Sequence, residues 1–287
     1  MSCPPEEDAV DHRHVVADYF RLERWEIEPA SGSGDPSAIG GRVPVDPLQR
    51  SAGGGLRTGG LVGCIDSLGG FLCGISVLPD WVVTTSVMTT VARLSHQGPL
   101  RLDGRVLRRG RNSVVAALGV IDEGNDDREV AAATMTCAVL DPGDRNLHVE
   151  RPFAAPMARY DPQALAPEEF FGIEPGADSV TRLHVVDRIR NPWGILHGGA
   201  LAVLVDVAAC RAAEADLSTS SPMGRDHRVA AVDTVLHFLR PVKVGPLEAR
   251  CQVLGSRNDR TLVRVAVHDV GVADRMVTLG SVEVVAV

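Results

Sequence analysis

Lysine is almost missing from this 287-residue sequence, in which Lys243 is the only lysine among 29 basic residues. Acidic residues number 37, so the formal net charge is −8. A protein that binds nucleic acid through its phosphates needs a basic face, so this balance argues against nucleic acid as a partner. The preference for arginine leaves two explanations open: a GC-rich coding sequence, which we favour, and a need for guanidinium groups that bind phosphate.

Paired cysteines and long apolar runs are also missing. The six cysteines form no C-x-x-C pair, and several stand in apolar runs where a thiol packs like a small apolar side chain. We therefore expect no disulfide framework and no metal site. No uninterrupted apolar run reaches about 18 residues, so we expect no membrane span. Residues 1–14 are acidic and polar; we interpret them as a flexible tail without a signal peptide, and we predict a cytoplasmic protein.

Several catalytic signatures are missing as well. The sequence has no G-x-S-x-G motif of a serine hydrolase. The glycine-rich stretches 32–34 and 52–55 lack the strand–loop–helix context of a phosphate-binding loop. Aromatic residues make up 4% of the chain, which argues against a pocket built by aromatic stacking.

What the sequence does contain is the same order of segments twice. Residues 15–140 and 168–287 each hold one apolar helix followed by a meander of four Val- and Thr-rich strands, with one further strand before the helix. We interpret the Pro-rich residues 141–167 as a linker between the two domains. The Gly- and Pro-rich residues 31–60 predict a long loop.

The repeat has a definite register. The tripeptide GPL occurs at 98–100 and again at 245–247, an offset of 147 (245 − 98). With that offset held, Asp122 aligns with Asp269. The preceding helices align at an offset of 140, so an insertion of seven residues (147 − 140) falls in the loop 218–228, where insertions cost little.

These observations predict an α+β fold of two tandem domains, each a curved antiparallel sheet wrapped around one long buried helix. A sheet that wraps around a helix explains why neither helix has a polar face. Two such units in one chain would associate as a covalent pseudo-dimer.

One stretch carries the chemistry, NPWGILHGGALAVLVD at residues 191–206. It predicts a buried helix that begins near His197 and carries Asp206 further along. A helix N-terminus presents unpaired N–H groups and a partial positive charge, and glycine lets a substrate approach them closely. Such an end can polarise a carbonyl group and stabilise its oxyanion. The carboxylate lies about 13 Å further along the axis, too far away to act at the same helix end.

The order of segments and the pattern N-x-x-G-x-x-H-G-G followed by Asp resemble the hotdog-fold thioesterases, specifically the PaaI-like acyl-CoA thioesterases. The resemblance is good over about 180–287 and faint over 55–140. The residues that carry it are Asn191, Gly194, His197, Gly198, Gly199 and Asp206. It implies hydrolysis of an acyl-CoA or acyl-carrier thioester, with CoA as part of the substrate, no other cofactor, and further association of the pseudo-dimer into a homo-oligomer.

In that family the helix end of one subunit faces the carboxylate of the other. For a tandem chain the resemblance implies a composite site in which the second helix end faces Asp66, the counterpart of Asp206. The resemblance implies that Asp66 is the general base or nucleophile and that the Gly198 N–H is the oxyanion donor. It implies that Asn191 and His197 orient the loop and the acyl carbonyl. Thr84 would position water.

The reciprocal site lacks the motif. The first helix begins after SAGGGLRTGG, with Arg57 and Thr58 at the positions of the His-Gly pair, and Ala231 is the counterpart of Thr84. We therefore predict one working site per chain. Whether Asp206 is a relic, a structural carboxylate or part of a second active site stays open.

Two hairpin turns carry arginines, LRRGRN at 107–112 and GSRNDR at 255–260. Guanidinium groups suit the phosphates of CoA. We therefore predict CoA contacts at Gly199, Arg109, Arg111, Arg257 and Arg260. Solvated surface charge is the competing explanation for the turns.

Two other functions stay open. A hotdog-fold enoyl-thioester hydratase or dehydratase would carry an Asp a few residues before the His, and here Asp187 and His197 are too far apart. A non-catalytic acyl-CoA-binding module would fit the degenerate first repeat. Measuring the release of free thiol from an acyl-CoA would distinguish a hydrolytic enzyme from such a binding module.

Overall fold

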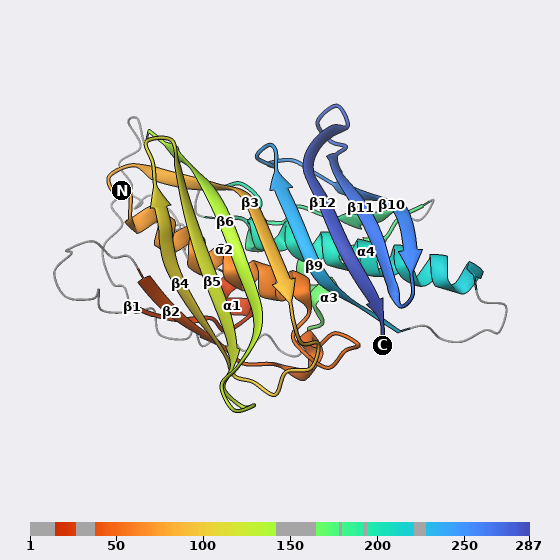
Figure 1. Ribbon diagram of the computed structural model, residues 1–287. Coiled ribbons are helices and arrows are strands. Elements are labelled where there is room, and N and C mark those ends of the chain that lie inside the picture. Colours follow the sequence, from red (N-terminus) through yellow and green to blue (C-terminus); the bar gives the residue numbers. More distant parts are fainter. Residues whose placement is uncertain (1–14, 27–37, 142–164, 178–179, 192–193, 221–227) are drawn as a thin grey trace, which may run out of the picture.

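The computed structural model describes residues 15–26, 38–141, 165–177, 180–191, 194–220 and 228–287. The predicted tail 1–14 and most of the predicted linker lie outside these residues. Twelve strands form one continuous sheet, and two long helices lie together on one of its faces (Figure 1). The predicted α+β class is confirmed.

Both repeats contain the same elements. The first repeat consists of α1 (Val15–Tyr19), β1 (Glu23–Glu26), β2 (Ala38–Val43), a 3-10 turn (Pro47–Gln49), α2 (Thr58–Ile75), β3 (Trp81–Val91), β4 (Leu100–Arg109), β5 (Ser113–Asp122) and β6 (Arg128–Leu140). The second consists of α3 (Pro167–Phe171), β7 (Ile173–Pro175), β8 (Thr181–Leu183), a 3-10 turn (Asp187–Ile189), α4 (Gly198–Ser220), β9 (Val229–Phe238), β10 (Leu247–Arg257), β11 (Arg260–Asp269) and β12 (Arg275–Ala286).

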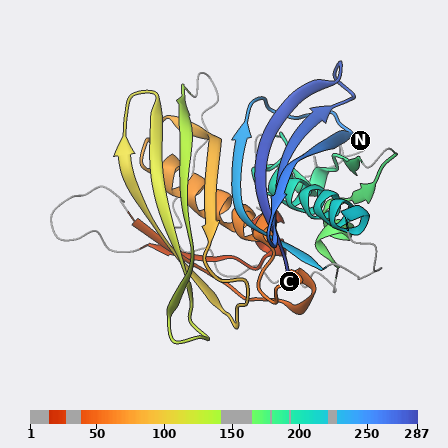
Figure 2. The same ribbon diagram turned by 45° about the vertical axis from the view of Figure 1, so that its right-hand side comes forward.

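The sheet joins the two repeats edge to edge. Its strand order is β1-β2-β4-β5-β6-β3-β9-β12-β11-β10-β8-β7, so β3 and β9 form the central antiparallel pair. Met88 lies opposite Val235 in that pair. These residues are 147 positions apart (235 − 88), so the local two-fold axis that relates the repeats passes between them. The turned view shows the sheet curving around both helices (Figure 2).

The aligned aspartates explain why the register repeats. Asp122 is fully buried and accepts hydrogen bonds from the backbone N–H groups of Gln97 and Gly98, at 2.8 and 2.7 Å. Asp269 is equally buried and accepts from the N–H of Gly245 at 3.1 Å. Each carboxylate therefore holds the turn that precedes β4 or β10 in its own repeat.

Three details of the predicted repeat are wrong. β3 pairs with β6 and β9 rather than with β4, so only β4, β5 and β6 form a meander. Each repeat has two strands before its long helix rather than one. The predicted loop over 31–60 contains strand β2, whose sequence AIGGRV was not predicted to form a strand. Its Gly40 lies against the Trp25 ring, which a Cβ atom would strike, so glycine here serves close packing rather than a turn.

The two long helices cross with their backbones close together. A Cβ atom on Gly63 would lie 3.3 Å from the Cα of Gly199, and one on Gly59 would lie 2.8 Å from the carbonyl oxygen of Ala202. This crossing brings the N-terminus of each helix against the middle of the other. α2 is long and apolar enough to cross a membrane, but 78% of that stretch is buried inside the protein.

An aromatic cluster packs the short helices α1 and α3 together next to this crossing. Tyr19 of α1 stacks on Phe170 of α3, with ring centroids 4.0 Å apart. Phe20 and Phe171 stack beside them at 6.2 Å, and all four rings are fully buried. The Phe20 ring fills the space beside Gly60 of α2. The cluster therefore joins the two repeats next to the helix ends.

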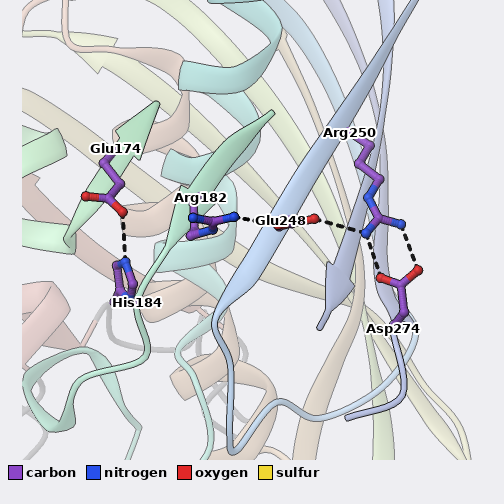
Figure 3. Close-up of polar contacts among 6 residues, drawn as sticks. All are labelled: Glu174, Arg182, His184, Glu248, Arg250 and Asp274. Atoms are coloured by element: carbon purple, nitrogen blue, oxygen red, sulfur yellow. Dashed lines mark hydrogen bonds and ion pairs between the residues drawn. The ribbon is translucent and has the colours of Figure 1, made fainter. Parts of the chain in front are cut away.

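Charged side chains cover the outer strands of the second repeat (Figure 3). Arg182 of β8 donates to Glu248 of β10 at 2.8 Å. Arg250 donates to the same carboxylate at 3.0 Å and to Asp274 at 2.7 Å. These pairs are partly or fully exposed to solvent and contribute little to stability, but charge near a sheet edge discourages pairing with another chain.

Candidate active site

The N-terminus of α4 is capped by a histidine. His197 Nδ1 accepts a hydrogen bond from the Gly199 N–H at 2.9 Å, as an N-cap side chain does. The N–H groups of Ala200 and Leu201 donate to the His197 carbonyl oxygen. Within the described part of the chain, the Gly198 N–H has no acceptor, and Gly198 is partly exposed to solvent. One backbone donor at this helix end is therefore available to a substrate.

The loop before the cap is held by Asn191. Its Oδ1 accepts from the Ile195 N–H at 3.3 Å, and its backbone N–H donates to the Ile195 carbonyl oxygen at 2.8 Å. Gly194, in the same turn, adopts a φ of 72°, which favours glycine. Asn191 thus stabilises the loop that precedes His197.

Asp66 of α2 faces this helix end from the other repeat. Its Oδ2 lies 3.6 Å from His197 Nδ1, and a Cβ atom on Gly198 would lie 2.6 Å from the same oxygen. The residue is only 8% exposed, and its buried Oδ1 has no hydrogen-bond partner among the residues that the structure describes. The structure thus brings Asp66, His197 and Gly198 together from the two repeats.

The histidine beside this carboxylate is neutral. Burial lowers the pKa of His197, and the charge of Asp66 opposes that effect only in part. Because Nδ1 accepts the Gly199 N–H, the ring proton lies on Nε2, 3.5 Å from Ser67 Oγ. That hydroxyl donates to the Gly63 carbonyl oxygen at 2.9 Å. The sequence interpretation missed Ser67, although its position next to Asp66 was the available signal.

Thr84 lies one helical turn from the carboxylate rather than against it. Its Oγ1 is 3.9 Å from the position of a Cβ atom on Gly70, and 3.9 Å from the Sγ of Cys137. Gly70 follows Asp66 by four residues on the same face of α2. The threonine therefore borders the space beside Asp66.

The reciprocal helix end is closed by an ion pair. Arg57 Nε lies 3.4 Å from Asp206 Oδ2, and Arg57 Nη1 also contacts Glu168. The Gly59 N–H bonds to the Asp206 carboxylate, whereas its counterpart at Gly199 is taken by the histidine. Thr58 donates to the Ala231 carbonyl oxygen at 2.6 Å. Asp206 is therefore fully partnered, in contrast to Asp66.

Electrostatics reinforce this difference. Burial would lower the pKa of Arg57, but Asp206 and Glu168 raise it far more, so the guanidinium stays charged. Burial raises the pKa of Asp206, and Arg57 and the Gly59 N–H offset part of that increase. The sequence revealed only that the motif was lost here, and did not reveal that Arg57 neutralises the carboxylate.

The arginines predicted to bind CoA lie at two different places. Arg109 and Arg111 line a surface hollow of about 400 Å³ near the C-terminal end of α2. Arg257 and Arg260 face each other at the turn between β10 and β11, where Arg260 pairs with Glu283. Gly199, predicted with them, has its N–H occupied by His197. Among the residues that the structure describes, no three His, Cys, Asp or Glu side chains are grouped to hold a metal ion.

Comparison with known proteins bears directly on this arrangement. Residues 194–273 match the family model of the thioesterase superfamily. This match lies within the second repeat. The expected enzyme class, a thioester hydrolase, is confirmed at the level of this family. Among curated proteins, none matches the sequence.

Several solved structures share the fold of the whole chain. A tesB protein of Mycobacterium avium subspecies paratuberculosis is 13% identical, with a TM-score of 0.60 over 89% of this chain and 95% of its own. An acyl-CoA thioesterase II of Mycobacterium marinum is 15% identical, with a TM-score of 0.54 over 95% and 96%. A hotdog-fold protein of Alicyclobacillus acidocaldarius is 14% identical, with a TM-score of 0.58 over 96% and 98%. The predicted double-hotdog fold is confirmed.

Substitution of Gly198 by alanine is expected to impair the site without unfolding the protein. The new Cβ atom would lie 2.6 Å from Asp66 Oδ2 and would displace the carboxylate from the helix end. Alanine keeps the backbone N–H of residue 198, so the effect comes from the displaced carboxylate, and we expect kcat for thioester hydrolysis to fall by about 10²-fold, as when a reacting group is misplaced by about 1 Å. Thr58→Ala at the equivalent position of α2 is the matched control. Equal losses in both variants would contradict the asymmetry.

The buried neutral histidine is expected to make stability depend on pH. Burial lowers the pKa of His197 in the folded state, so below about pH 6.5 the unfolded chain takes up a proton that the folded chain does not. The free energy of unfolding should therefore fall as the pH drops through this range, by up to about 1.4 kcal/mol per pH unit. His197→Asn keeps a capping side chain and should reduce this loss. Urea unfolding at about pH 5 and about pH 7 measures it, and identical losses would contradict the assignment.

Proposed function

We propose that the chain hydrolyses an acyl-CoA thioester at the composite site formed by Asp66 and the N-terminus of α4. The observation that carries this proposal is the contrast between two equivalent carboxylates. Asp66 is buried with one oxygen unpartnered beside an available backbone donor, whereas Asp206 is neutralised by Arg57. An unpartnered buried carboxylate costs stability, and such a cost is typical of a functional group.

The chemistry follows from the positions of these groups. The thioester carbonyl oxygen binds at the Gly198 N–H, which stabilises the oxyanion as it forms. Asp66 removes a proton from a water molecule, whose oxygen attacks the carbonyl carbon. The carbon–sulfur bond then breaks, and the thiolate takes the proton from Asp66, which yields one carboxylic acid and one thiol. His197 stays neutral and holds the Gly199 N–H, so that the helix end presents only the Gly198 N–H.

Direct attack by Asp66 on the carbonyl carbon is the other course of this reaction. It would give a mixed anhydride, which water then hydrolyses. Single-turnover hydrolysis in oxygen-labelled water distinguishes the two routes. Only the anhydride route can transfer an unlabelled oxygen of the Asp66 carboxylate to the carboxylic acid product.

Release of free thiol from a panel of acyl-CoA substrates tests the proposed function. Acetyl-, octanoyl-, palmitoyl- and benzoyl-CoA cover short, medium, long and aromatic acyl groups. Turnover of any of them that depends on Asp66 supports the proposal. Binding without turnover would instead indicate an acyl-CoA-binding module, and hydration of an enoyl-CoA without thiol release would indicate a hydratase.

A further inference from the structure

Ser67 stands next to Asp66 on α2, a helix whose other hydroxyl side chain is that of Thr58. Ser67 is half-buried, and its Oγ donates to the Gly63 carbonyl oxygen at 2.9 Å. A hydroxyl that bonds the carbonyl four residues earlier slightly destabilises a helix, and alanine has a higher helix propensity than serine. The stability of α2 therefore does not explain why a serine stands at this position.

The Ser67 hydroxyl meets His197 across the helix crossing. Because the hydroxyl proton is used on Gly63, the oxygen offers its lone pairs to another donor. His197 Nε2 lies 3.5 Å from this oxygen, at the outer limit of a hydrogen bond. Nε2 carries the ring proton, since Nδ1 accepts the Gly199 N–H at 2.9 Å. A chain of donors thus runs from Nε2–H to Ser67 Oγ, and from Ser67 to the backbone of α2.

The other ring nitrogen shows what the alternative tautomer would do. His197 Nδ1 lies 3.6 Å from Asp66 Oδ2. An unprotonated Nδ1 and a carboxylate oxygen are both acceptors, so no hydrogen bond joins them while the ring proton is on Nε2. A proton on Nδ1 would instead be donated to Asp66, and the Gly199 N–H would lose its acceptor. The tautomer of His197 therefore decides whether this carboxylate oxygen stays free.

We propose that Ser67 is a positioning residue, which holds His197 in its Nε2–H tautomer and so keeps Asp66 free to take a proton from water. The inference rests on the proposed function, because it concerns how that site keeps its base unpartnered beside a histidine. Ser67 acts through His197 and does not itself react. Asp66 Oδ1 also has no partner among the described residues, so both carboxylate oxygens stay available.

The reciprocal site carries neither member of this pair. The residue equivalent to Ser67 on α4 is Val207 (207 − 140 = 67), which is buried and has no hydrogen-bonding side chain. Arg57 stands at the position of the histidine and pairs directly with Asp206. A guanidinium has no tautomer that needs to be selected, since it is always charged. The hydroxyl therefore accompanies the histidine and is missing where the histidine is missing.

The tautomer of His197 can be measured without substrate. Nitrogen-15 NMR of protein labelled at histidine distinguishes a protonated ring nitrogen from an unprotonated one. The His197 signals are assigned by their loss in His197→Asn, at about pH 8, where histidine is neutral. Wild-type protein should carry the proton on Nε2. In Ser67→Ala the Nε2–H loses its acceptor, so the Nδ1–H form should gain about tenfold relative to the Nε2–H form.

The same variant should slow thiol release without weakening substrate binding. We expect Ser67→Ala to lower kcat about tenfold and to leave KM within about twofold of wild type, because Ser67 acts on the base rather than on the substrate. The acyl-CoA that the wild-type protein hydrolyses fastest serves as the substrate. Ser67→Thr keeps a hydroxyl that can bond the Gly63 carbonyl oxygen, and it should restore both the tautomer and kcat.

A matched serine on α4 controls for the loss of a helical hydroxyl. Ser218 donates to the Glu214 carbonyl oxygen at 2.7 Å, which is the same bond to the fourth preceding residue. It follows Gly198 by twenty residues, or roughly 30 Å along the helix, so it lies far from the site. Ser218→Ala should leave the His197 signals, kcat and KM unchanged. Circular dichroism should show the wild-type fold in both alanine variants, because alanine favours a helix.

The possible failures are distinguishable. An unchanged His197 tautomer in Ser67→Ala would overturn the inference, even where the wild-type protein hydrolyses thioesters. A change in KM alone would also overturn it, because Ser67 would then be a substrate contact, and so would a fall in kcat that Ser67→Thr does not restore. If the folded wild-type protein hydrolyses no acyl-CoA, the proposed function itself fails, and the NMR measurement still reports whether Ser67 holds His197.

Discussion

Asp66→Asn is expected to lower kcat for thioester hydrolysis by about 10²–10⁴, whereas Asp206→Asn should leave kcat within a few-fold of wild type. An amide cannot take a proton from water or attack a carbonyl carbon, so the first substitution removes the reacting group. The second changes a carboxylate that already bonds Arg57 and the Gly59 N–H. Thiol release under saturating substrate measures both.

The two variants control each other because the repeat places both residues in the same setting. Each lies nine residues after the residue that precedes its helix, and each is nearly buried, at 8% exposed for Asp66 and 4% for Asp206. A non-specific effect of placing an amide at the helix crossing would appear in both. If Asp206→Asn abolishes turnover and Asp66→Asn does not, the assignment is reversed. Loss in both would show that the two carboxylates act together.

Much of the fold could be predicted because the repeat is visible in strand residues. The offset of 147 read from the GPL tripeptides relates the strands that start at 100, 113 and 128 in the structure to those that start at 247, 260 and 275. The strand β2 could not be predicted, because Gly40 and Gly41 read as a loop. Their role depends on Trp25 and Leu22, which approach from a neighbouring strand and helix connection.

The candidate site could be predicted only in part. Helix geometry places His197 and Asp206 too far apart for a site on one helix, and the repeat predicts Asp66 as the partner of the His-Gly pair. The ion pair between Arg57 and Asp206 at the reciprocal site could not be predicted from the repeat. Arg57 reaches Asp206 only because the two helices cross at Gly63 and Gly199, and that distance depends on packing between segments far apart in the sequence.

Arg57→Ala is expected to lower the free energy of unfolding by about 3–5 kcal/mol and to leave the Asp66 site active. The substitution leaves Asp206 buried without its cation, and removing one partner of a buried ion pair costs far more than the pair contributes. The pKa of Asp206, already raised by burial, should rise further, so the loss should be smaller at low pH. Urea unfolding at several pH values measures this change.

A double variant separates the ion pair from packing. Arg57→Met with Asp206→Leu removes both charges, and replacing a buried pair by apolar side chains is often neutral or stabilising. We therefore expect it to recover most of the stability lost in Arg57→Ala, with kcat close to wild type. Recovery would mean that the loss in Arg57→Ala comes from the Asp206 carboxylate left buried without its cation. If the double variant stays as unstable as Arg57→Ala, the loss comes from packing at the helix crossing; if it loses turnover, the Asp206 site takes part in catalysis.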